Sequence, residues 1–274
     1  MPNQRTTGPT HQQFATLLIT LKTVLTWVKP NEKPRKLSLS QGLKMTLIYH
    51  RHNLTEELLA DFFDVSQPTV SRPINTVEKA LLHVLEPLTK PLSEALNQPG
   101  SLVVDGTLIP VWNWRSLGKT NFSGKHKRAG FNHQVICTLD GKLLAITEPL
   151  PGARHDAYAF RTHRLDRYLD SSTLADKGYV GLGLATPTKR RPGVKTGAQV
   201  KKVNRVINRL RSVVERVIAQ VKTWRVLHSG FRRPLRVYGR VFSVVRGVGV
   251  FGGWLPLMNK PLYTPISCFK SCWP

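Results

Sequence analysis

Three acidic residues stand where a carboxylate could do chemistry. Asp105 follows the short apolar run at 102–104, and Asp176 follows the short stretch Thr-Leu-Ala at 173–175. Glu215 lies in a basic stretch, and from Lys177 to the C-terminus it is the one acid beside 20 Lys and Arg residues. Burying an acid at such a strand position is costly unless it binds a cation. These positions therefore indicate a cation site.

The spacing of apolar residues around Glu215 predicts which way its side chain faces. On a helical projection the apolar residues form one face, and Arg211, Glu215 and Lys222 share an edge of it. That apolar face consists of Val206, Leu210, Val213, Val214, Val217 and Val221. We expect Glu215 to point toward the strands that carry the two aspartates. The alternative is a simple pair with Arg211, worth about 0.2–0.5 kcal/mol.

Three carboxylates that converge from two strands and one helix favour a divalent cation. Mg²⁺ and Mn²⁺ prefer oxygen ligands and keep positions open for water and phosphate. Two such ions can activate a water or a 3′-hydroxyl and stabilise the leaving oxygen in phosphodiester cleavage. The pattern predicts a metal-dependent nuclease with Asp105, Asp176 and Glu215 in its site.

The elements that would position these acids form an α/β layout. Strands are expected at 101–112, at 131–150 as a hairpin around Asp140-Gly141, and at 171–180. Helices are expected at 157–169 and as one long element at about 200–225. Helical periodicity also marks 11–28, 38–51, 54–63 and 67–86. We divide the chain into a helical domain (1–98), an α/β domain (99–250) and an atypical tail (251–274).

Residues 54–82 have the spacing of a helix-turn-helix. Thr55 and Ser66 are positioned to cap its two helices, and Pro73 is expected to kink or end the second one. The first helix would turn Leu58, Leu59, Phe62 and Phe63 inward, and the second would present Gln67, Thr69, Ser71 and Arg72 to DNA. A helical hairpin that binds nothing is the alternative.

The charge of the chain indicates a polyanionic partner. With 41 Lys and Arg against 16 Asp and Glu, the net charge is +25, and nucleic acid is the commonest partner of such a protein. The sequence contains no long uncharged apolar run, so we expect no membrane span. Three cysteines without framework spacing favour a reducing cytoplasm.

Several stretches resemble the DDE superfamily of transposases, in the branch of the insertion-sequence-five group and the Harbinger-like elements. They are 103–107, the basic segment 122–135, the Pro-Gly-x-x-His-Asp block in 149–160, the Asp-Lys-Gly-Tyr block in 174–181, and 227–235. The helix adds the family's spacing with Arg211, Glu215 and Lys222. The resemblance covers about residues 40–250.

This resemblance implies a ribonuclease H-like catalytic domain, a mixed sheet with flanking helices, after an all-α helix-turn-helix domain. It implies cut-and-paste transposition at terminal inverted repeats, with Asp105, Asp176 and Glu215 as the catalytic triad and Mg²⁺ or Mn²⁺ as cofactor. Asp156 would be a fourth metal-binding carboxylate, and either Asp156 or Asp176 would be the principal second aspartate. Residues that would hold DNA are Lys125, His126, Lys127, Arg128, Arg211 and Lys222.

The implied partners are the element's ends and the target DNA, bound by at least a dimer in the bacterial cytoplasm, on the nucleoid. Two other functions stay open. One is a DNA-binding protein without catalysis, derived from a transposase, and the other is a host nuclease that cuts RNA–DNA hybrids. The helix-turn-helix disfavours the latter, because the major groove of A-form hybrids excludes a recognition helix.

Overall fold

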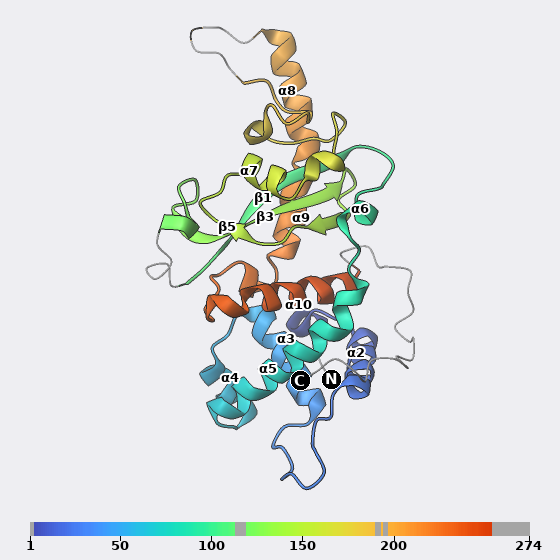
Figure 1. Ribbon diagram of the computed structural model, residues 1–274, viewed down its shortest axis with the longest axis vertical. Helices are drawn as coiled ribbons and strands as arrows, with labels where there is room; N and C mark the ends of the chain where they lie inside the picture. The colour runs from blue at the N-terminus through green and yellow to red at the C-terminus, as the bar shows by residue number, and fades with distance from the viewer. Residues whose placement is uncertain (1–2, 113–118, 190–192, 194–196, 254–274) are drawn as a thin grey trace.

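The structure is a computed structural model that describes residues 3–112, 119–189, 193 and 197–253. The atypical tail predicted from 251 therefore lies outside the described residues from 254 onward. Figure 1 shows a helical part at one end of the molecule, a sheet in the middle and a single projecting helix at the other end. In the described part of the chain, no helix combines the length and the apolar character needed to cross a membrane.

The N-terminal part is helical, as predicted. Its helices are α1 (Gln4–Thr7), α2 (His11–Val24), α3 (Leu39–His52), α4 (Glu56–Phe63) and α5 (Gln67–Leu85). Reciprocal capping boxes begin two of them, with Thr10 and Gln13 at α2 and Ser38 and Gln41 at α3. Each box satisfies two backbone N–H groups that the first turn leaves without partners.

The α4–α5 pair has the predicted helix-turn-helix arrangement, but two of its details differ. The Thr55 side chain accepts from the Leu58 N–H, as expected, whereas the Ser66 hydroxyl contacts the Thr69 hydroxyl and caps no backbone group. Leu59 is buried, but Leu58 is exposed and Phe62 is 67% exposed. The inward orientation predicted for Leu58 and Phe62 is wrong, because α4 contacts its neighbours along one narrow face only.

Pro73 does not end α5, so this prediction was also wrong. The helix continues from Gln67 to Leu85 with Pro73 buried inside it. A proline here removes the hydrogen bond to the Thr69 carbonyl, at a cost of about 3 kcal/mol. Burial of Val70, Ile74 and the apolar residues after them offsets that cost, because each buried aliphatic side chain contributes about 1.5–3 kcal/mol.

The sheet is built around one long central strand. β3 (Arg128–Thr138) pairs antiparallel with β1 (Leu102–Pro110), β2 (Phe122–Ser123), β4 (Leu143–Ile146) and β5 (Leu150–Pro151). The β3–β4 connection turns at Asp140-Gly141, as predicted, and Gly141 has the positive φ of 91° that favours glycine. On the other edge, Leu174 makes parallel bridges to Val103 and to Ala185.

These parallel bridges make the sheet mixed, as expected for a ribonuclease H-like fold. The strand predicted at 171–180 is shorter than expected, because only the bridges of Leu174 remain of it before a turn of 3₁₀ helix at Lys177–Tyr179. Further short helices are α6 (Leu92–Ala95) and the 3₁₀ turns Glu86–Leu88, Lys119–Asn121, Leu165–Arg167, Arg225–Leu227 and Leu235–Val237.

Helices cover both faces of the sheet, and the alternation of side chains along β1 shows which face each residue joins. Val104 and Phe160 belong to the core under α7 (Asp156–Thr162). Val103 and Val217 belong to the opposite core, under α9 (Val213–Val221). Because successive strand residues point to opposite faces, Asp105 shares the α9 side with Val103, and Gly106 shares the α7 side with Val104.

The predicted long helix is interrupted at Ser212, which separates α8 (Ala198–Arg211) from α9. The buried face was predicted correctly for α9, whose Val213 and Val214 are buried. It was wrong for α8, where Val206 is 51% exposed and Leu210 is 44% exposed. Figure 1 shows the reason: α8 extends past the edge of the sheet. Its Asn204 exchanges hydrogen bonds with the Thr188 backbone, but none of its residues is buried.

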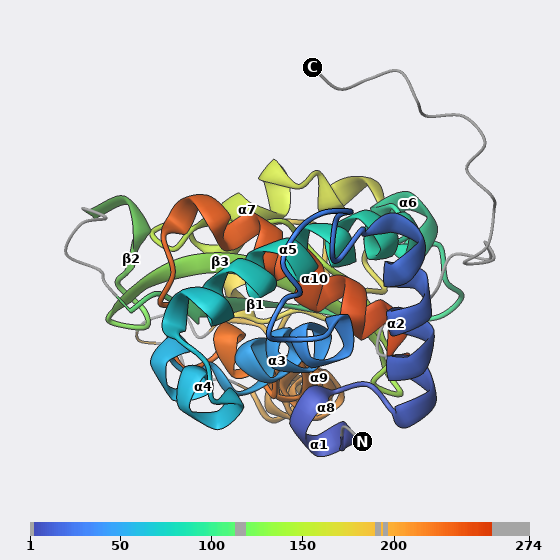
Figure 2. The ribbon, with the colours of Figure 1, turned by 90° about the horizontal axis from the view of Figure 1, so that it is seen from below.

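Helix α10 (Tyr238–Phe251) joins the two parts of the molecule. It lies between α5 and the sheet in Figure 1 and crosses α5 in Figure 2, and one buried cluster runs through all three. Within this contact, Glu78 of α5 is fully buried and pairs with Arg233 and Arg240. Asn75 accepts hydrogen bonds from the same two guanidiniums at 2.8 and 2.9 Å. The helical part is therefore fixed to the sheet by polar as well as apolar contacts.

Candidate active site

Asp105 and Asp176 are brought side by side by the parallel bridge between Val103 and Leu174. Each aspartate stands two residues beyond its bridging residue, so the two occupy matching positions on neighbouring chain segments. An Asp176 carboxylate oxygen accepts the Gly178 N–H at 2.7 Å, which caps the 3₁₀ turn that follows. The local sequence Asp-Lys-Gly-Tyr thus holds Asp176 at the point where the short pairing ends.

The Asp105 carboxylate is mostly buried and lies near two other carboxylates, so a nearby positive charge stabilises its ionised form. Burial raises the pKa of this carboxyl, the Arg211 guanidinium opposes that rise, and the nearby carboxylates of Asp176 and Asp156 add to it. Arg211 Nη1 donates to Asp105 Oδ2 at 2.9 Å. The Gly106 N–H donates to the other carboxylate oxygen at 2.9 Å. The site gathers acids around one guanidinium.

Glu215 faces the same guanidinium from the helix side. Its Oε1 lies 3.9 Å from Arg211 Nη2, and its side chain is 67% exposed. Arg211 therefore stands between Asp105 and Glu215, and the pair weighed as the alternative for Glu215 is present in the structure. Among the described residues, no group of three or more His, Cys, Asp and Glu side chains lies close enough together to hold a metal ion.

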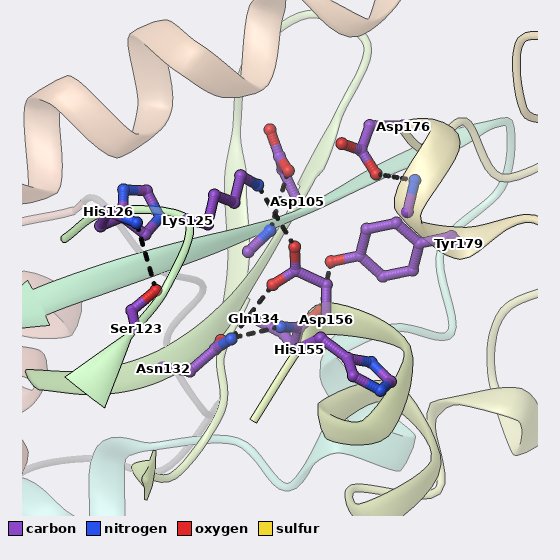
Figure 3. Close-up of polar contacts among 12 residues, drawn as sticks. Asp105, Ser123, Lys125, His126, Asn132, Gln134, His155, Asp156, Asp176 and Tyr179 are labelled. Carbon is purple, nitrogen blue, oxygen red and sulfur yellow. Dashed lines mark hydrogen bonds and ion pairs between the residues drawn. The ribbon is translucent and has the colours of Figure 1, made fainter. Parts of the chain in front are cut away.

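Asp156 lies on the other face of β1, at the first position of α7. A side chain on Gly106 would overlap the Asp156 carboxylate, so glycine is required there for this close approach. The carboxylate accepts from Asn132 Nδ2 at 3.1 Å, and Lys125 Nζ lies 3.5 Å from it. His155 caps α7, with its Nδ1 accepting from the Tyr158 N–H at 3.2 Å. Figure 3 shows Asp105, Asp156 and Asp176 arriving from three separate segments.

The four basic residues predicted to bind DNA in the α/β domain lie on one exposed turn. Lys125, His126 and Lys127 connect β2 to β3, Arg128 is the first residue of β3, and all four are exposed. Partial burial lowers the pKa of His126, and the charges of Lys125 and Lys222 lower it further. This influence places Lys222, at the end of α9, near the turn. The structure therefore brings this basic turn and Lys222 to the same side of the molecule.

Comparison with known proteins shows the family to which the chain belongs. The family described as DDE superfamily endonuclease matches residues 104–247, and the helix-turn-helix of DDE superfamily endonuclease matches residues 35–87. The chain belongs to the DDE superfamily of endonucleases. Its matched part contains Asp105, Asp156, Asp176 and Glu215.

Relatives of this DDE superfamily chain are similar over most of their length. A protein of Streptomyces albus G, named for the transposase of insertion sequence element IS112, is 30% identical over 81% of this chain and 84% of its own. A protein of Microchaete diplosiphon, named for the transposase of insertion sequence element IS702, is 28% identical over 80% of this chain and 82% of its own. No solved structure matches the chain.

In the helix-turn-helix of this DDE superfamily member, the four predicted DNA-contacting residues lie on the first turns of α5. Arg72 is exposed, and Gln67, Thr69 and Ser71 are half-buried. The Gln67 amide donates to a Glu56 carboxylate oxygen on α4. This bond orients Gln67 against the preceding helix, so Arg72 is the most accessible of the four.

The surroundings of the three aspartates also contain polar residues that were not predicted from the sequence. The Tyr179 hydroxyl donates to Gln134 Oε1, Gln134 Nε2 donates to Asn132 Oδ1 at 3.0 Å, and Asn132 reaches Asp156. These hydrogen bonds connect the 3₁₀ turn at 177–179, strand β3 and the start of α7. Three consecutive polar residues inside a strand, at 132–134, are the signal that could have revealed it, because a buried strand rarely accepts them without partners.

Proposed function

We propose that this chain is a transposase, a divalent-metal-dependent DNA endonuclease and strand transferase that acts at the ends of its element. One observation carries the proposal: Asp105 and Asp176 lie at matching positions on paired segments, with Glu215 across from them behind one guanidinium. The names of the relatives and the helix-turn-helix match support the same function.

The donor set fits Mg²⁺ or Mn²⁺. It consists of hard carboxylate oxygens, and the half-buried Asp105 carboxylate already attracts a cationic group, the Arg211 guanidinium at 2.9 Å. We assign Asp105, Asp176 and Glu215 to the metals, with the exposed Glu215 free to turn toward the aspartates. When bound, such ions supply an activated water or 3′-hydroxyl and stabilise the leaving oxygen.

Asp176 is our choice for the principal second aspartate, because it shares the α9 side of β1 with Asp105. Asp156 approaches from the α7 side, where Asn132 and Lys125 hold it. We therefore propose that Asp156 contributes to the metal site from behind β1, by its charge and by fixing the backbone at Gly106. Arg211 would pass from the carboxylates to a DNA phosphate when a cation enters.

The remaining basic residues would hold DNA. The exposed turn 125–128 and the half-buried Lys222 near it suit the phosphates that flank the reacting bond, while the first turns of α5 suit the element's terminal repeat. Transposition requires two ends held together, so we propose a working complex of at least two copies of the chain.

Cleavage of a duplex that carries the element's end, with Mg²⁺ or Mn²⁺, tests this function. We expect wild type to cut and Asp105→Ala, Asp176→Ala and Glu215→Ala to bind the duplex without cutting. Asp166→Ala, at an exposed acid outside the site, is the matched control and is expected to cut like wild type.

Two outcomes would overturn the proposal. Binding without cutting by folded wild-type protein would favour the second candidate, a DNA-binding protein without catalysis. The position of Arg211 between Asp105 and Glu215 is the observation that favours that candidate. Cutting of RNA–DNA hybrids in preference to DNA ends would instead indicate a host nuclease.

A further inference from the structure

A hollow lies at the end of β1, away from the carboxylates. Its volume is about 590 Å³, which is in the range of small-molecule sites. Trp112 and Phe122 are its aromatic residues, and Lys127 and Arg128 are its charged ones. Pro110, Val111, Ala129, Ser229 and Gly230 complete the lining. None of these described lining residues is acidic.

Trp112 presents an unusually large apolar surface to solvent. Its side chain is 64% exposed, although indole rings are among the most favourable groups to bury. The backbone holds it firmly, because its N–H donates to the Phe231 carbonyl at 2.9 Å and Val111 bridges to Phe231. Gly230 packs beside its backbone and ring, with a positive φ of 104°. A fixed backbone thus carries an exposed ring, which is the arrangement of a stacking surface.

The charge around Trp112 selects an anionic ligand. The Arg232 guanidinium carbon lies 5.0 Å from the centre of the indole ring, in cation–π contact. Lys127 and Arg128 line the same hollow together with the exposed Phe122. Aromatic rings interleaved with Lys and Arg are the composition that binds unpaired nucleotides, because bases stack on the rings while phosphates meet the cations.

The hollow adjoins the basic turn 125–128 that is proposed to hold DNA, because Lys127 and Arg128 belong to both. Asp105 and Trp112 are seven residues apart along extended chain, so they are separated by about 23 Å, or about seven nucleotide steps. On the other side, Asn53 at the end of α3 donates to Ser229 and Gly230 at 2.8 and 2.9 Å. DNA that spans from the helix-turn-helix to the carboxylates would pass this hollow.

We propose that the Trp112–Phe122 hollow binds an unstacked nucleobase of the DNA end. The inference rests on the proposed function for its ligand, but it assigns a separate site with separate chemistry. The base would stack on the Trp112 indole, and Lys127, Arg128 and Arg232 would contact the phosphates beside it. The site would favour DNA that has unpaired bases near the cleavage position over fully paired DNA.

Binding experiments without divalent metal separate this site from catalysis. Two fluorescent duplexes of the same sequence are compared by anisotropy, one fully paired and one with a two-base mismatched bubble about seven steps from the end. Wild type is expected to bind the bubble more tightly. Trp112→Ala is expected to lose affinity for the bubble by about 5- to 100-fold, the loss that removing one base–aromatic stack produces, and to keep its affinity for the paired duplex.

Two further variants make the result specific. Trp112→Phe keeps a ring and is expected to restore most of the preference for the bubble. Tyr168→Ala removes an exposed aromatic ring that does not line the hollow and is expected to behave like wild type. Circular dichroism confirms that each variant is folded.

The outcomes distinguish the site from the proposed function. Equal affinity of wild type for both duplexes, or an unchanged preference in folded Trp112→Ala, would overturn the nucleobase site whether or not the protein cuts DNA. A preference that depends on Trp112 in a protein that never cuts would support the site and count against the transposase proposal alone.

Discussion

The buried Glu78 allows a prediction whose magnitude follows from the structure. Oxygens of its carboxylate contact His50 Nε2 at 3.1 Å, Arg240 Nε at 3.2 Å and Arg233 Nη1. Burial by itself would raise the pKa of Glu78, but the hydrogen bond and charge of His50 and the charge of Arg233 lower it from 4.5 to about 2. A difference of this size corresponds to about 3 kcal/mol of stabilisation of the ionised form.

The perturbation is Glu78→Gln, which keeps the shape of the side chain and removes its charge. We expect the free energy of unfolding at pH 7 to fall by about 3 kcal/mol, because two partly buried guanidiniums lose their counter-charge. For a chain of this size the midpoint of thermal unfolding would fall by about 6–12 °C. Urea unfolding followed by circular dichroism measures the first quantity, and a thermal scan measures the second.

The pH dependence adds an independent check. Because the folded pKa of Glu78 is lower than the unfolded one, its stabilisation is complete above about pH 4.5 and is lost as the pH falls through about 2. The difference between wild type and Glu78→Gln would therefore shrink over that window. Glu148→Gln is the matched control, since Glu148 also pairs with an arginine but is 58% exposed, and a change below about 1 kcal/mol is expected. Equal stability of Glu78→Gln and wild type at pH 7 would refute the reasoning.

Two further predictions concern the sheet. Gly106→Ala is expected to lower the free energy of unfolding by about 1–3 kcal/mol, because the new methyl group displaces the Asp156 carboxylate from Asn132. Gly124 faces open space, so Gly124→Ala is the control and is expected to leave the stability in the same urea titration unchanged. Burial lowers the pKa of His133 to about 3, so stability is expected to fall as the pH drops from about 6.5 toward 3, where the unfolded chain takes up a proton that the folded one refuses. Imidazole NMR would show His133 neutral down to about pH 4, and a midpoint near 6.5 would contradict its burial.

The sequence by itself determined the elements whose signals are local. Capping residues and apolar periodicity predicted the helices from α2 to α5, and the Asp140-Gly141 pair predicted the β3–β4 hairpin, because each signal involves residues only a few positions apart. It also determined the expected order of strand, hairpin, helix, strand and helix along the second half of the chain. The resemblance to the DDE superfamily rests on the sequence motifs within that order.

Other features depended on contacts between distant segments. A period of 3.6 residues could not show that α8 leaves the sheet after Ser212, because the same valine spacing is buried in α9 and exposed in α8. Likewise, the rule that proline breaks helices considers only neighbouring residues. At Pro73 the burial of the helix against distant segments overrides that rule.

Tertiary structure alone decided the arrangement of the acids. Asp105 and Asp176 are 71 positions apart in the sequence, and a single parallel bridge at Val103 and Leu174 sets them side by side. Asp156, at the start of α7, lies instead on the opposite face of β1, against Gly106, where Asn132 bonds to it. The residue types indicate the chemistry, because a carboxylate can bind a cation wherever it lies in the chain. Strand pairing decides which carboxylates come together, and that pairing depends on the packing of the whole chain.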